Sequence, residues 1–90
     1  MTLEYSWDKG DFKIDLSEFV YGSKEYYTKS LRAICDILPP DSARDLLAKM
    51  KTYYTQWYDS IAPFYEMSSE RESECRAIET LLTALEEFRI

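Results

Sequence analysis

The chain has 90 residues, which is enough for one domain and too few for two. An apolar fraction of 46% is too high for a disordered protein, and the scarcity of glycine favours helices over a turn-rich β-sandwich. The net charge of −6, with no cluster of Lys and Arg, argues against direct binding of a phosphate backbone. Histidine is absent, which removes the commonest general base and metal ligand.

The cysteines and the apolar runs indicate the cellular compartment. Cys35 and Cys75 are far apart and have no ligand or redox spacing. Both fall at apolar helix positions, so we expect buried free thiols, which fit a reducing cytoplasm. Residues 1–10 carry charges and no apolar run, unlike a signal peptide, and no apolar stretch is long enough to cross a bilayer. We therefore expect a soluble, cytoplasmic protein without membrane contact.

Residues 3–16 are predicted to form a β-hairpin. Apolar and polar residues alternate on both sides of a turn at residues 8–11, which is the period of a half-buried strand. Gly10 suits the turn because glycine accepts a positive φ. An isolated hairpin is marginal in water, so this one must pack on something. The predicted inward side chains are Leu3, Tyr5, Trp7, Phe12, Ile14 and Leu16.

Residues 23–38 are predicted to form the first helix, after a connector with at most a short helical turn at residues 18–20. Ser23 has the side chain of an N-cap. Pro39 and Pro40 end the helix, because proline disfavours helical geometry in the residue before it. The predicted inward stripe contains Tyr27, Leu31, Ile34 and Leu38, with Cys35 at its edge.

Residues 42–62 are predicted to form a central helix with neighbours on two sides. Asp41 is the expected N-cap, and Pro63 either kinks or ends the helix. Apolar residues repeat with alternating spacings of four and three, and further apolar residues widen this stripe on both sides. The predicted stripe contains Ala43, Leu47, Met50, Tyr54, Trp57 and Ile61, widened by Leu46, Tyr53 and Tyr58.

Residues 70–89 are predicted to form the third helix. Ser69 and Glu72 match a capping box, in which each side chain binds the free N–H of the other residue. The element order is then ββααα. We expect one domain over residues 1–90, of α+β class and mostly α, with an N-terminal hairpin on a three-helix bundle. The predicted inward side chains of the third helix are Cys75, Ile78, Leu81, Leu82, Leu85 and Phe88.

A row of acids on the third helix is a candidate partner-binding surface. Glu72, Glu79 and Glu86 are seven residues apart, so they share a face at intervals of about 10 Å. Such a row fits a basic groove that normally holds nucleic acid. The alternative is a solvated helix face, which is what most charge rows are. Arginines at three positions dilute the negative field: Arg71, Arg76 and Arg89.

A dense group of aromatic residues is the second candidate. Tyr53, Tyr58 and Tyr65 belong to a run of rings over residues 53–65, which a domain this small cannot bury entirely. Tyrosine is enriched at interface hot spots because it combines large contact area with a polar group. The alternative is that these rings form the core with Trp7 of the hairpin.

The sequence gives little support for metal binding or catalysis. The acids of the hairpin do not have the alternating ligands and closing glutamate of a calcium loop, so a structural turn is favoured over a metal site. No nucleophile elbow, phosphate loop or activating base is found. We therefore expect neither an enzyme nor a cofactor.

The leading hypothesis is a non-catalytic module that binds a larger protein. Its most concrete form is a small acidic inhibitor of a nucleic-acid-handling protein, like the anti-defence (anti-CRISPR-like) factors of phages and mobile elements. Glu72, Glu79 and Glu86 would meet the basic groove of the partner, and Tyr53, Tyr58 and Tyr65 would anchor the contact.

Two other hypotheses remain. A structural or assembly protein would act as a homodimer, a larger homo-oligomer or a complex subunit through its Tyr-rich face. A winged-helix DNA binder would also have three helices and a hairpin. Its charge would be wrong, and its hairpin would follow the helices rather than precede them, so we expect no direct nucleic-acid binding.

Overall fold

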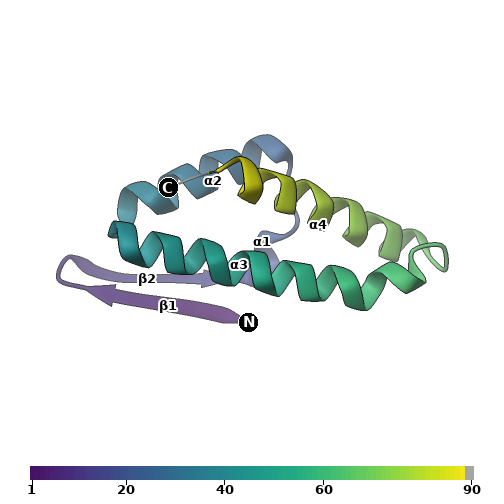
Figure 1. Ribbon diagram of the computed structural model, residues 1–90, viewed down its shortest axis with the longest axis horizontal. Coiled ribbons are helices and arrows are strands. Elements are labelled where there is room, and N and C mark those ends of the chain that lie inside the picture. Colours follow the sequence, from purple (N-terminus) through teal and green to yellow (C-terminus); the bar gives the residue numbers. More distant parts are fainter. Residues whose placement is uncertain (89–90) are drawn as a thin grey trace.

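The computed structural model describes residues 1–88. The last predicted helix ends at Glu87, two residues before its predicted end at residue 89, because Phe88 is an extended C-cap. The fold is α+β and mostly α, with an N-terminal hairpin followed by helices, as the sequence predicts. In chain order the elements in Figure 1 are β1 (Thr2–Trp7), β2 (Gly10–Asp15), α1 (Leu16–Phe19), α2 (Lys24–Ile37), α3 (Pro40–Ile61), the 3₁₀ helix η1 (Ala62–Phe64) and α4 (Ser69–Glu87).

The hairpin is antiparallel and has the predicted alternation. Leu3 pairs with Ile14 and Tyr5 with Phe12, so these side chains lie on the face that packs toward the helices. Gly10 closes the turn with φ +142°, a backbone conformation that residues with a side chain rarely adopt. The positive φ predicted for this position is confirmed.

A short helix, α1, follows β2 directly, where the sequence predicts a connector with at most a short helical turn at residues 18–20. The Asp15 carboxylate caps α1 by accepting a hydrogen bond from the Ser17 N–H at 2.9 Å. Leu16, predicted as the last inward residue of the hairpin, is instead the buried first residue of α1. This turn directs the chain from the sheet into the helical layer.

α2 follows the prediction closely. The Ser23 hydroxyl accepts a hydrogen bond from the Tyr26 N–H at 3.1 Å, and the predicted stripe is buried.

The start of α3 differs from the predicted one. Asp41 is not its N-cap, because α3 begins at Pro40, two residues before the predicted start at residue 42, and Pro39 takes the capping position. Proline suits the first helical position, since its fixed φ is already helical and its missing N–H would have no partner there.

The buried stripe of α3 is also shifted from the predicted one. Leu46 is fully buried, whereas Leu47 and Trp57 are only partly buried. A straight helix with 3.6 residues per turn drifts away from a strict heptad repeat, which moves the centre of the stripe. The buried residues are Ala43, Leu46, Met50, Tyr54 and Ile61.

Pro63 ends α3 and does not kink it. The α-helix stops at Ile61, and η1 continues the chain for one 3₁₀ turn. The capping box predicted for α4 is wrong by one residue: Ser68 is the N-cap and accepts from the Arg71 N–H at 3.2 Å. Ser69 is therefore the first helical residue.

The core of α4 differs at its edges from the predicted set. Ala84 is buried, whereas Leu82 and Phe88 are only partly buried. Leu82 lies at the edge of the buried stripe, and Phe88 is the C-cap that follows the last helical residue, Glu87. The buried residues of α4 are Cys75, Ile78, Leu81, Ala84 and Leu85.

α3 is the central element of an elongated molecule of 47 × 22 × 16 Å. The hairpin lies along the first half of α3, and α2 and α4 lie on the other side of it (Figure 1). The second half of α3 and the first half of α4 extend past the hairpin as a helical pair (Figure 1). Within residues 1–88, none of the helices is long and apolar enough to span a membrane.

Candidate protein-binding surface

The acidic row on α4 divides into an ion-paired end and an exposed end. Glu72 is half-buried and forms an ion pair with Arg76 at 2.5 Å. Glu79 and Glu86 are exposed further along the helix. The exposed part of the predicted row therefore consists of these last two carboxylates.

Tyr58 of α3 lies against this exposed end. Its hydroxyl donates a hydrogen bond to the Glu79 carboxylate at 2.8 Å. This hydrogen bond, together with the negative charge of Glu79, raises the pKa of the Tyr58 hydroxyl. Tyr58 and Glu79 line a shallow depression of about 320 Å³ that also contains Leu82, Thr83 and Glu86. Three of the six predicted site residues are thus brought together by α3 and α4.

Tyr65 belongs to the ion-paired end of the row. It is half-buried and lies just after η1. Tyr65 raises the pKa of the Arg76 guanidinium, and the negative charge of Glu72 raises it further. The contact of Arg76 that the geometry fixes is its ion pair with Glu72, the first carboxylate of the row. The cation lowers the negative potential at Glu72, so the field is strongest near Glu79 and Glu86.

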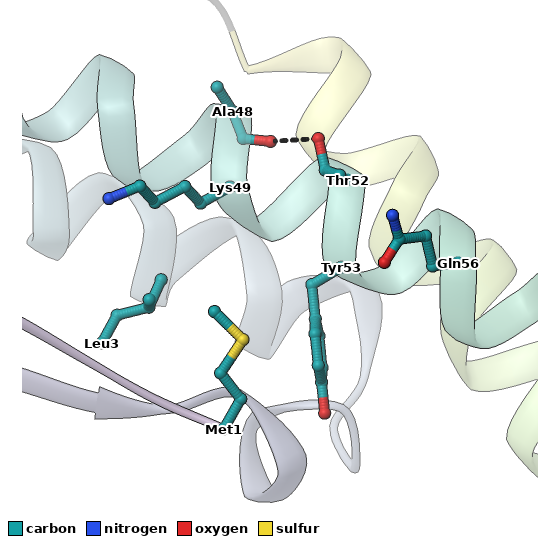
Figure 2. Close-up of a pocket in the computed structure, with 7 residues that line it drawn as sticks. All are labelled: Met1, Leu3, Ala48, Lys49, Thr52, Tyr53 and Gln56. Carbon is teal, nitrogen blue, oxygen red and sulfur yellow. Dashed lines mark hydrogen bonds between the residues drawn. The ribbon is translucent and has the colours of Figure 1, made fainter.

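Tyr53 lies on a different side of α3. Five residues of α-helix turn by about 140° relative to Tyr58, which directs Tyr53 toward the hairpin. Its hydroxyl is 3.4 Å from that of Ser17. Figure 2 shows Tyr53 in an apolar groove of about 400 Å³ between the N-terminal strand and α3, which is also lined by Met1, Leu3, Ala48, Lys49, Thr52 and Gln56. The structure does not bring Tyr53 to the surface formed by the other five residues.

Several exposed apolar side chains do not belong to the predicted site. Tyr21 is 66% exposed in the connector before α2, and Met67 is 76% exposed in the loop before α4. Phe64, the last residue of η1, is also exposed and lies next to Tyr65. In the sequence, Pro63 indicates that the helix ends here. An exposed aromatic ring after the end of the helix could have been expected from that signal.

The two thiols are shielded from solvent. Cys75 is buried and Cys35 is half-buried, and both are free. Burial raises the pKa of each thiol, which keeps it protonated and unreactive at neutral pH. Within residues 1–88, no group of three or more Cys, Asp or Glu side chains is placed to hold a metal ion.

Comparisons with known proteins identify no relative. No protein-family model, no curated protein and no solved structure matches the chain. The surface on α3 and α4 therefore has to be interpreted from its own chemistry.

Proposed function

We propose that the protein is a non-catalytic binding module that contacts a larger protein through the surface formed by Tyr58, Glu79 and Glu86. The observation that carries this proposal is the hydrogen bond from Tyr58 to Glu79. It holds an aromatic ring beside two exposed carboxylates, and an ordered ring with a polar group loses little entropy on binding.

The partner should present a basic patch. Glu79 and Glu86 provide the negative charge, while Leu82 in the depression between them provides apolar contact. Glu72 and Tyr65 extend the surface toward the loop, with Arg76 attenuating the charge there. The net charge of −6 favours fast association with such a patch.

A groove that normally holds nucleic acid is the most concrete basic surface of this kind. We therefore propose that the protein inhibits a nucleic-acid-handling protein, as an anti-defence (anti-CRISPR-like) factor of a phage or mobile element does. The same charge repels phosphate, so direct binding of nucleic acid is not part of the proposal.

The test is capture of partners by the tagged protein from a lysate of the cells that make it. The lysate is treated with nuclease, and the eluate is read by mass spectrometry and light scattering. The proposal predicts a nuclease-resistant complex with a basic protein, which dissociates as salt is raised. Recovery of no partner, or of a complex that nuclease destroys, would contradict it.

A further inference from the structure

The outer edge of β2 has no partner strand. Residues 1–88 contain a sheet of two strands, so each strand has one unpaired edge. Along β2 the exposed side chains alternate in charge, with Asp11 negative and Lys13 positive. Phe12 and Ile14 are partly buried against the core. An unpaired strand edge of this kind readily pairs with another extended segment.

We propose that a second copy of this chain occupies the edge, with the β2 strands of the two copies antiparallel and centred on Phe12. This register places Asp11 of each copy opposite Lys13 of the other, so the same ion pair forms twice. Gly10 of each copy then lies opposite Ile14 of the other. Opposite charges across neighbouring strands stabilise the pairing, and like charges destabilise it.

The outer face of the sheet supports the same register. Lys13 already forms an ion pair with Glu4 of β1 at 3.1 Å. In the four-stranded sheet of the dimer, Lys13 therefore lies between Glu4 of its own chain and Asp11 of the second copy. Each cation has an anion on both sides, which gives a charge ladder across the interface.

Other self-pairings lack this complementarity. A register centred on Asp11 or on Lys13 places like charges opposite each other. A register centred on Ile14 would need Asp15, whose carboxylate already caps α1. β1 has a single charged residue, Glu4, so its self-pairing gains no ion pair. The charge pattern therefore selects the edge of β2 and one register along it.

The test is the mass in solution, measured by sedimentation equilibrium on the untagged chain. A dimer of twice the 10.7 kDa chain mass is expected. Asp11→Lys should shift the equilibrium to monomer by roughly tenfold or more, because it places two cations opposite each other. Asp8→Lys makes the same charge change in the adjacent turn and should leave the dimer intact. Circular dichroism verifies that each variant is folded.

The triple variant Glu4→Lys, Asp11→Lys, Lys13→Asp inverts every charge of the ladder and should restore the dimer. This rescue separates the proposed register from a general loss of stability. A wild-type chain that sediments as a monomer at about 1 mM, where even a millimolar Kd gives substantial dimer, overturns the proposal. A dimer that Asp11→Lys does not weaken also overturns it. Neither outcome bears on the surface of α3 and α4, which lies outside this interface.

Discussion

The hydroxyl of Tyr54, in the middle of α3, donates a hydrogen bond to the backbone carbonyl of Leu16 at 2.6 Å. Both residues are fully buried. The bond fixes the central helix to the turn that leaves the hairpin, two segments far apart in the sequence. It therefore determines how the hairpin sits on the helical layer.

Replacing Tyr54 with Phe should lower the free energy of unfolding by about 1–3 kcal/mol, because the buried carbonyl of Leu16 loses its partner. Urea unfolding followed by circular dichroism measures the change. Tyr21→Phe is the matched control, since Tyr21 is mostly exposed, and should change stability little. Equal stability of the Tyr54 variant and the wild type would show that the bond does not hold the hairpin in place.

The cap of α4 gives a second prediction, with its control in the neighbouring residue. Ser68→Ala removes the oxygen that accepts from the Arg71 N–H, and should cost about 1 kcal/mol of stability. Ser69→Ala leaves this bond intact and should have a much smaller effect. The two variants are compared by urea unfolding, and a larger loss for Ser69 than for Ser68 would refute the assignment of the cap.

Stability should fall at alkaline pH. Burial raises the pKa of Tyr5 from its ordinary value of 10.0 to about 12, helped by the hydrogen bond to Asp45. Burial also raises the pKa of Tyr54 and of Tyr27. Because the unfolded chain releases these protons first, the stabilisation is complete below pH 10 and is lost as pH rises through 12.

The measurement is a series of urea titrations across this range of pH. Cys75 adds a decline that starts near its ordinary pKa of 9.0, since burial raises its pKa as well. Tyr5→Phe should make the decline less steep above pH 10. A free energy of unfolding that stays constant up to pH 12 would contradict the assignment.

A labelled DNA duplex at low salt should not bind. The acidic surface repels phosphate, and the few cations near it are engaged in ion pairs, such as that of Arg76 with Glu72. Fluorescence anisotropy of the duplex, titrated with the protein, measures this. Saturable binding that weakens as salt rises would instead favour a direct nucleic-acid binder.

The sequence predicts the elements well because their periodicities are strong. Leu3 and Tyr5 alternate with polar residues, and Tyr27, Leu31 and Ile34 repeat with helical spacing, so the hairpin and α2 follow directly. The ends of helices are harder to predict. Asp41 and Ser69 both have capping side chains, but α3 begins two residues, and α4 one residue, before the start that each predicted cap implies. Neighbouring candidates differ too little in propensity for the sequence alone to decide.

The candidate surface could be predicted only in part. The spacing of Glu79 and Glu86 places them on one face of a helix, as the structure shows. The neighbours of Tyr58 and Tyr53 depend instead on which side of α3 faces the hairpin. That choice is made by tertiary packing, and no local pattern specifies it. The place of Tyr65 likewise depends on the turn at η1, which it directly follows.

The most direct test of the proposed surface is the affinity of the captured partner for a charge-reversed variant. Glu72→Lys, Glu79→Lys and Glu86→Lys are combined, and binding is measured by titration calorimetry. Asp8→Lys, Glu18→Lys and Glu25→Lys, combined in a second variant, make the same change of charge away from α4. The proposal predicts that the first variant remains folded and loses binding, while the second keeps most of its affinity. Undiminished affinity of the first variant would contradict the proposed binding surface.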